Sequence, residues 1–200
     1  VKFTSKEGVQ DFVWATSWGV STRLMGALVM AHSDDDGLIL PPKLAPIQVV
    51  IVPIYKGDEQ LSQINNYVEG IKKSLEKRGI SVKYDNRDTH KPGWKFAEYE
   101  MKGVPVRIAV GPRDIENNSV VVARRDIQNT KKSIPINTLD SEITSLLDTI
   151  QNEMLKVSEQ FLIDNTSHAE NMDELLKQLQ DSDGFVSCYW SESKEDELRV

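Results

Sequence analysis

The chain has 200 residues, enough for one large or two small domains, and its 39% hydrophobic residues are typical of a globular rather than a disordered protein. Its net charge of -7 argues against a protein coated with basic residues for general nucleic-acid binding. No apolar run is long enough to span a membrane and no signal peptide is recognisable, so we expect no membrane association. The single cysteine, Cys188, cannot form an internal disulfide, which favours a cytoplasmic location.

The segment before Pro41 combines apolar and aromatic stretches with turn residues. In chain order we expect a buried strand over 12–18, a buried helix over 21–32, a turn over 34–37 and a short strand over 38–40. Ser21 is a suitable N-cap for the helix, whose body is almost entirely apolar. Two adjacent prolines then interrupt regular structure, so we place a domain boundary at 41–46 and assign 1–44 to a first domain.

Strands and helices alternate between Ala45 and about Asn165, which predicts a compact α/β domain over 45–165, with a mixed sheet flanked by helices. We expect strands over 47–52, 80–84, 106–110 and 119–123, and helices over 58–78, 93–102 and 139–161. The first strand is a continuous β-branched run, typical of the middle of a parallel sheet. The last helix should turn one apolar stripe inward, formed by Leu139, Ile143, Leu146, Ile150, Met154, Val157 and Phe161.

Residues 166–200 predict a helix over 171–179 and a strand over 184–190, which we interpret as the start of a small α+β domain. Between Lys91 and Lys132, nine basic residues stand against five acidic ones, so this part of an acidic chain is locally positive. Local positive charge suits contact with a phosphate backbone, although most charge clusters are solvated surfaces.

Ser21 and Arg23 lie at the predicted start of the first helix. A helix start offers backbone N–H groups and an Arg beside it adds a planar cation, so a phosphate or a ring could bind there. For this pattern alone, a buried helix with a single Arg that reaches the surface is the more common arrangement.

Two blocks of the sequence carry specific motifs. The first consists of Ser17-Trp-Gly-Val-Ser-Thr-Arg23 and Gly37-Leu-Ile-Leu-Pro-Pro42. The second consists of Asp85-Asn-Arg-Asp88, Lys91-Pro-Gly-Trp-Lys-Phe-Ala-Glu-Tyr-Glu-Met-Lys-Gly-Val-Pro-Val-Arg107 and Val110-Gly-Pro-Arg-Asp114. The first block resembles the third class II signature of the prolyl-tRNA synthetases, which implies that 1–44 is the C-terminal end of a class II catalytic domain. The second block resembles the anticodon-binding domain of the same family, which implies that 45–165 is that domain. The two blocks follow the family's order and spacing, and they point to the archaeal and eukaryotic-like branch with an extra C-terminal domain.

For the first block the resemblance implies roles in proline activation. Arg23 would be the catalytic cation that contacts the ATP phosphates and adenine and stabilises the charge that develops on pyrophosphate. Ser21 would supply a hydroxyl at the same ATP site. Ser17, Trp18 and Gly19 would form the wall of the proline pocket, where an indole face suits the ring and the ammonium group of proline. An ordinary core aromatic is the alternative interpretation of Trp18.

For the second block the resemblance implies an anticodon-binding site at Phe96, Glu100 and Arg107. Phe96 and Glu100 are four residues apart and so share one helix face. An aromatic ring can stack on a base, Glu can accept from base N–H groups, and Arg can donate to guanine O6 and N7, which suits the two adjacent guanines of the proline anticodon. The alternative is a core Phe96 beside a surface ion pair between Glu100 and Arg107. Three nearby cations would contact phosphates: Lys91, Lys95 and Arg113.

The resemblance further implies ATP, Mg2+ and proline as ligands, tRNA(Pro) as partner, a homodimer as assembly and the cytoplasm as location. The first two class II signatures are missing and Val1 is not an initiator Met, so we interpret the chain as a C-terminal fragment that is inactive alone. Cys188 by itself cannot fill a tetrahedral zinc site, so we expect no zinc site in this chain and a buried thiol. The alternative function is a non-catalytic tRNA-binding or RNA-binding module derived from a class II synthetase.

Overall fold

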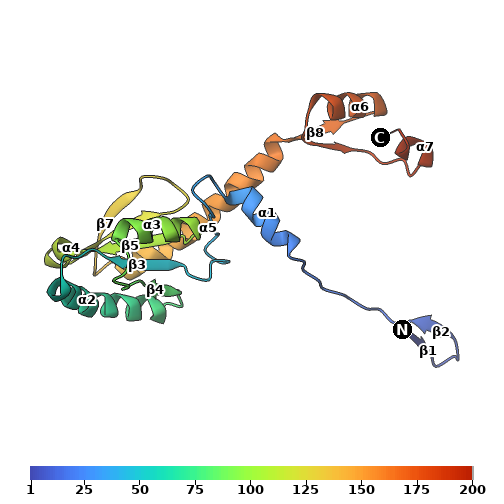
Figure 1. Cartoon of the computed structure of the whole chain (residues 1–200). Coiled ribbons are helices and arrows are strands. Elements are labelled where there is room, and N and C mark those ends of the chain that lie inside the picture. Colours follow the sequence, from blue (N-terminus) through green and yellow to red (C-terminus); the bar gives the residue numbers. More distant parts are fainter. Residues whose placement is uncertain (200) are drawn as a thin grey trace.

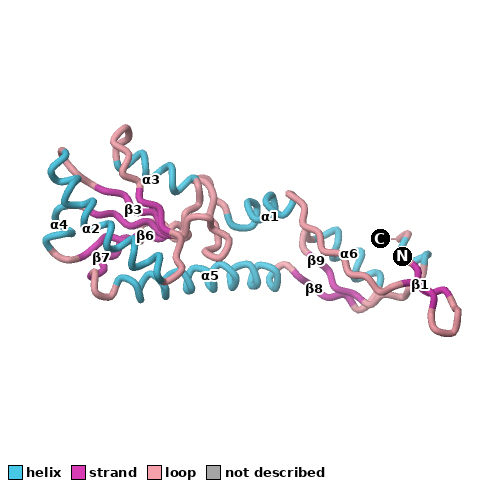
Figure 2. The backbone as a smooth tube through the Cα atoms, turned by 90° about the horizontal axis from the view of Figure 1, so that it is seen from below, coloured by secondary structure: helices cyan, strands magenta, loops and turns pink. Residues whose placement is uncertain are grey.

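The computed structural model describes residues 1–199 as an N-terminal hairpin, a central α/β domain and a C-terminal β-α-β unit (Figures 1 and 2). The hairpin pairs β1 (Lys2–Thr4) with β2 (Gln10–Phe12) in antiparallel fashion. An extended segment joins it to helix α1 (Arg23–His32), so the hairpin lies away from the central domain (Figure 1).

The segment around α1 departs from the sequence-based expectation. The buried strand predicted over 12–18 is wrong, because β2 ends at Phe12 and residues 13–20 form no regular structure. Helix α1 forms as predicted, but none of its residues is buried, and its N-cap is Thr22 rather than Ser21. Apolar side chains become buried only where another layer covers them, and within residues 1–199 no layer covers this segment.

A mixed sheet forms the centre of the α/β domain, as the sequence predicts, and it has five strands, one more than the four expected. In spatial order its strands are β4 (Val82–Tyr84), β3 (Val49–Pro53), β5 (Val106–Val110), β6 (Ser119–Arg124) and β7 (Lys131–Pro135). Strand β3 pairs in parallel with both β4 and β5, whereas β6 and β7 continue the sheet in antiparallel fashion. All of β3 is buried, which accounts for its unbroken apolar sequence.

Helices cover the two faces of this sheet unequally (Figure 1). The main core lies on one face, where α2 (Asp58–Lys77) and α5 (Leu139–Asp164) pack against the strands. On the other face, α3 (Pro92–Met101) packs Tyr99 against Val50 and Val52 of β3. Because α3 covers only the β3 side of its face, the part formed by β5, β6 and β7 stays open.

The second half of the domain contains the other differences from prediction. Neither α4 (Pro112–Glu116) nor β7 was expected, and β7 is an edge strand in which only Ile134 is buried, so it lacks a clear apolar alternation. In α5, Leu147 is buried while Leu146 is only half-buried. Val157 and Phe161 are exposed, because α5 continues beyond the sheet toward the C-terminal unit (Figure 2).

Residues 34–44 pack against the sheet domain, although we expected them to precede its boundary. The amide of Leu38 donates to the carbonyl oxygen of Met101 at 3.1 Å, and the amide of Leu40 donates to the carbonyl oxygen of Gly103 at 3.3 Å. The short strand predicted here is therefore an extended segment that is hydrogen-bonded to the end of α3. This placement connects the segment after α1 directly to the helix that carries the second block.

The C-terminal unit consists of β8 (Thr166–Ala169), α6 (Met172–Asp181), β9 (Phe185–Cys188) and the short α7 (Lys194–Glu197). Strands β8 and β9 are parallel, and α6 packs against both. Cys188 is exposed rather than buried as predicted, because a two-stranded sheet with a single helix leaves much of its surface uncovered. In the part of the chain that the structure describes, no helix has the length and apolar character needed to cross a membrane.

Candidate nucleic-acid interface

The open part of the sheet carries two cations separated by small residues. Strand β5 alternates between the two faces, so Arg107 and Ala109 lie opposite the main core. The strand register places Ala123 of β6 beside Arg107, and Lys131 of β7 beside Ala123. Since alanine side chains are short, a hollow forms above the sheet between the two cations.

This hollow is a surface pocket of about 380 Å³. Helix α3 forms one wall and the loop between β6 and β7 forms another. The wall from α3 consists of Gly93, Phe96, Ala97 and Glu100, which have the spacing of a single helix face. A smaller hollow of about 130 Å³ adjoins it beside Phe96, Arg107 and Lys131. The pocket therefore combines an aromatic ring, a carboxylate and cations.

Phe96, Glu100 and Arg107 lie together at this pocket. The guanidinium carbon of Arg107 stands 3.8 Å from the centre of the Phe96 ring, and its Nη2 lies 3.5 Å from Oε1 of Glu100. Burial lowers the pKa of Arg107, and the charge of Glu100 opposes this effect. An Arg side chain nevertheless stays protonated in proteins, so the pocket presents a fixed cation with several N–H donors beside a carboxylate.

Both interpretations of this trio find support in the geometry. Phe96 packs partly against the small core formed around Tyr99, and Glu100 forms an ion pair with Arg107, as the structural alternative requires. All three residues also line the pocket, as a binding role requires. The sequence correctly predicts that they lie together, while their role in recognising bases stays a prediction.

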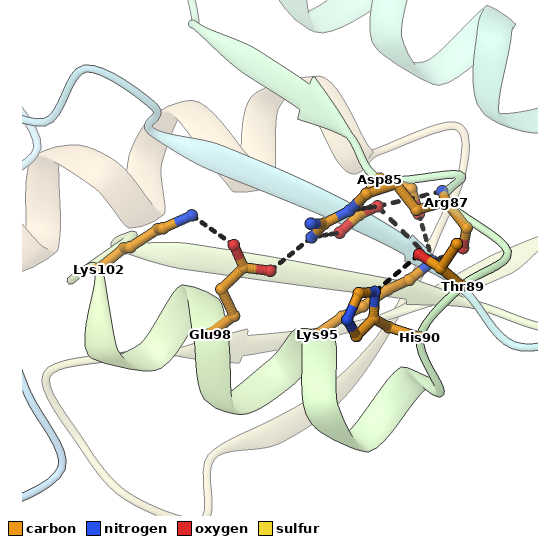
Figure 3. Close-up of polar contacts among 7 residues, drawn as sticks. All are labelled: Asp85, Arg87, Thr89, His90, Lys95, Glu98 and Lys102. Carbon is orange, nitrogen blue, oxygen red and sulfur yellow. Dashed lines mark hydrogen bonds and ion pairs between the residues drawn. The ribbon is translucent and has the colours of Figure 1, made fainter.

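A polar network ties α3 to the loop that follows β4 (Figure 3). Asp85 follows β4, is buried, and accepts hydrogen bonds from Nε and Nη2 of Arg87 at 2.9 and 2.6 Å. These bonds from Arg87 are the main reason why the pKa of Asp85 lies well below its usual range. Arg87 also pairs with Glu98 of α3, which in turn accepts from Lys102. The network ties the loop after β4 to α3 and so holds the pocket wall in place.

Lys95 belongs to this network, and its position corrects the expectation that it contacts phosphate. The side chain is buried, and its Nζ donates to the carbonyl oxygens of Asp85 and Arg87 and lies 3.6 Å from Oδ1 of Asp85. A buried ammonium group with such partners cannot reach a phosphate on the surface. The sequence shows a lysine near the start of α3, but only packing decides which helix face it occupies.

The other expected phosphate contacts are exposed. Lys91 is the N-cap of α3, and Arg113 lies on α4. Sequence reasoning missed Lys131 and Gln128, which line the pocket, because it did not predict β7 or the shape of the preceding loop. The only available signal was the surplus of basic residues in this part of the chain.

The first block forms no comparable site among residues 1–199. Ser17, Trp18, Gly19 and Ser21 lie in an exposed segment without regular structure, and Trp18 is 91% exposed. The hydroxyl of Ser21 accepts from the amide of Arg23 at 3.3 Å, at the start of α1. Within the described residues, no group of three or more His, Cys, Asp or Glu side chains could hold a metal ion. The predicted roles of these five residues in binding ATP and proline stay predictions.

Comparison with known proteins adds independent information. Residues 48–146 match the family model described as "Anticodon binding domain". Over 200 residues the chain is 52% identical to a protein named "Proline–tRNA ligase" from Porphyromonas gingivalis, and 48% and 50% identical to proteins of the same name from Christiangramia forsetii and Flavobacterium johnsoniae. Each match covers 100% of this chain and 40% of the relative, so the chain spans well under half the length of these relatives.

Proposed function

Because the chain belongs to the prolyl-tRNA synthetase family, we propose that it is the tRNA-reading part of a proline–tRNA ligase and that the pocket beside α3 binds the anticodon of tRNA(Pro). The main support is the group formed by Phe96, Glu100 and Arg107 at a pocket of about 380 Å³. Unpaired RNA bases are recognised by stacking and by hydrogen bonds to their edges, and this trio can do both.

The chemistry of the trio favours guanine. The guanidinium of Arg107 can donate to O6 and N7 of one guanine, and the carboxylate of Glu100 can accept from the N–H groups on the Watson–Crick edge of a guanine. Phe96 supports the Arg107 plane at 3.8 Å and so holds its donors in one orientation before RNA binds. Two adjacent guanines, as in the proline anticodon, would use both of the polar groups.

The complete ligase would catalyse two steps. A carboxylate oxygen of proline attacks the α-phosphorus of ATP and releases pyrophosphate, and a terminal hydroxyl of the tRNA then attacks the carbonyl of the resulting mixed anhydride, which forms the ester and releases AMP. In this chain, Arg23 would stabilise charge on the pyrophosphate beside Ser21, while Ser17, Trp18 and Gly19 would contact proline. Mg2+ would enter with ATP, held by its phosphate oxygens, and the described residues gather no group of three or more His, Cys, Asp or Glu side chains as a separate metal site. A homodimer in the cytoplasm is the assembly and location that we propose by analogy with the family.

A binding titration with two anticodon stem–loop RNAs tests this function. One RNA carries the proline anticodon and the other a transplanted, unrelated anticodon. Arg107→Ala should weaken binding of the first RNA by about 1–3 kcal/mol and leave the second nearly unchanged. If Lys91 contacts a phosphate, Lys91→Ala should weaken the binding of both RNAs alike. It should also reduce the slope of the logarithm of affinity against the logarithm of salt concentration by about one.

A matched control is available on the far side of the domain. Lys73 of α2 is exposed and forms an ion pair with Glu69 at 3.1 Å, so Lys73→Ala removes one charge without touching the pocket. It should leave the preference between the two RNAs unchanged. If Arg107→Ala, like this control, leaves the preference between the two RNAs unchanged, the pocket does not read the anticodon.

A further inference from the structure

Arg125 joins the pocket to the segment that follows α1. It comes directly after β6, and only 5% of its side chain is exposed. Its Nε donates to the carbonyl oxygen of Glu100 at 2.9 Å, while Nη1 and Nη2 donate to the two carboxylate oxygens of Asp34 at 2.8 and 2.5 Å. One buried guanidinium therefore holds the backbone of α3 and a loop 91 residues earlier in the chain.

The loop on the other side of this contact is itself ordered by hydrogen bonds. Oδ1 of Asp34 accepts from the amide of Asp36 at 3.0 Å, and Oδ2 of Asp36 accepts from Nε2 of Gln128 at 3.1 Å. The hydrogen bonds from Arg125 lower the pKa of Asp34 to about 2, so the carboxylate is charged at neutral pH. Arg125, Asp36 and Gln128 all line the pocket, which places this contact at the pocket wall.

Glu100 is the residue on which this arrangement acts. Its side chain pairs with Arg107 at the pocket wall, and its carbonyl oxygen accepts from Nε of Arg125. A bidentate pair between a guanidinium and a carboxylate has a defined plane, so Asp34 fixes the direction in which Arg125 presents Nε to α3. Because Glu100 lies near the C-terminal end of α3, where helices fray, such an outside donor restrains the backbone at that point.

We propose that Arg125, oriented by Asp34, is a positioning residue that holds Glu100 in the geometry needed to distinguish anticodons. This inference rests on the proposed function. Arg125 does not need to touch a base itself: it acts through the carbonyl oxygen of Glu100. The same pair also makes anticodon discrimination depend on the loop that follows α1, the helix that begins at Arg23.

The experiment uses the 200-residue chain and measures a discrimination ratio, which is the dissociation constant for the stem–loop with the unrelated anticodon divided by that for the stem–loop with the proline anticodon. Arg125→Lys keeps the charge but cannot form the bidentate pair, and Asp34→Asn removes the charged partner. Each should reduce the ratio by about fivefold or more, a part of the range for one base contact, with no change in salt dependence. The double variant should be no worse than the more affected single variant, because both changes remove the same contact.

Asp35→Asn is the matched control, since this exposed carboxylate lies in the same loop and should leave the ratio unchanged. All titrations are made well below the thermal midpoint of each variant, so that folding losses do not enter. If Arg125→Lys and Asp34→Asn lower stability but keep the parental ratio while Arg107→Ala reduces it, the pair is only structural and this inference is overturned. If Arg107→Ala also keeps the parental ratio, the proposed function itself fails.

Discussion

At the scale of single residues, burial separates cations that resemble one another in the sequence. Lys91 and Lys95 are four positions apart, yet Lys91 is exposed whereas Lys95 is enclosed by carbonyl groups and by Asp85. Arg107 is an intermediate case, because its side chain is 15% exposed and one face rests on Phe96. Folding has already removed most of the guanidinium from water, so RNA binding costs less additional desolvation free energy. The guanidinium therefore acts as a preorganised donor.

The buried carboxylate of Asp85 leads to a prediction about stability. Asp85→Asn should lower the free energy of unfolding at pH 7 by about 3 kcal/mol, because it leaves the buried ammonium group of Lys95 without its counter-charge and removes one of the two carboxylate partners of Arg87. The pKa of Asp85 is lowered in the folded state, so its stabilising effect is present above the unfolded pKa of about 4 and is lost as pH falls toward the folded value. The difference between parent and variant should therefore shrink below about pH 4.

Urea unfolding of both proteins at several pH values measures this difference. Asp88→Asn serves as the control, because Asp88 is an exposed carboxylate in the same loop. A constant difference between parent and Asp85→Asn from pH 7 down to pH 2 would show that the ionised carboxylate is not the source of the stability.

At the scale of secondary-structure elements, α3 owes its position to contacts along its whole length. Lys95 holds its first half, Glu98 ties its second half to Arg87, Tyr99 packs against β3, and Arg125 holds the carbonyl of Glu100 near its end. The remaining face lines the pocket. A helix fixed at both ends can keep its exposed side chains in a defined geometry, which is what recognition of base edges requires.

Gly37 lies in the loop that follows α1, and it provides a test of how closely this loop and α3 must approach each other. Its φ of 130° is unfavourable for other residues, and a Cβ there would lie 2.5 Å from Cα of Met101. Gly37→Ala should therefore lower the free energy of unfolding by more than about 1 kcal/mol. It should also reduce the preference for the proline anticodon, because the loop that carries Asp34 would move away from α3.

The control for this prediction is a glycine in an open helical position. Gly70 lies within α2, and a Cβ there would meet no atom within 4 Å. Gly70→Ala should raise the free energy of unfolding by about 0.5–1 kcal/mol, since alanine favours helices. Chemical denaturation of the two variants gives both values, and equal effects would show that space at Gly37 is not limiting.

At the scale of the whole molecule, the two sequence blocks differ in how far this chain can order them. The second block is built into a domain with its own core, whereas Trp14 and Trp18 before α1 are almost fully exposed. Four large apolar side chains of α1 are also exposed: Leu24, Met25, Val29 and Met30. A site for proline and ATP needs walls on several sides, and residues 1–199 do not supply them around the first block.

This contrast predicts that the chain by itself retains anticodon binding but not the activation of proline. The 200-residue chain should bind the proline anticodon stem–loop but show no proline-dependent exchange of pyrophosphate into ATP. In the complete ligase that we propose, Arg23→Ala should slow adenylate formation by about 10²-fold or more, the scale expected for loss of one charge partner in the transition state. Binding of the stem–loop should stay at the parental level. Exchange by the chain alone, or parental activity of Arg23→Ala, would contradict the assignment.

The sequence by itself determined the order of the main strands and helices, the family, and the grouping of Phe96, Glu100 and Arg107. These follow from local periodicity and from motifs, which are properties of residues close in the chain. The tertiary structure alone decided that Lys95 is buried, that β7 completes the sheet, that α1 is uncovered, and that Arg125 reaches Asp34. Each of these depends on which surfaces pack together, and the pattern of residues along one segment does not specify which distant segment will pack against it.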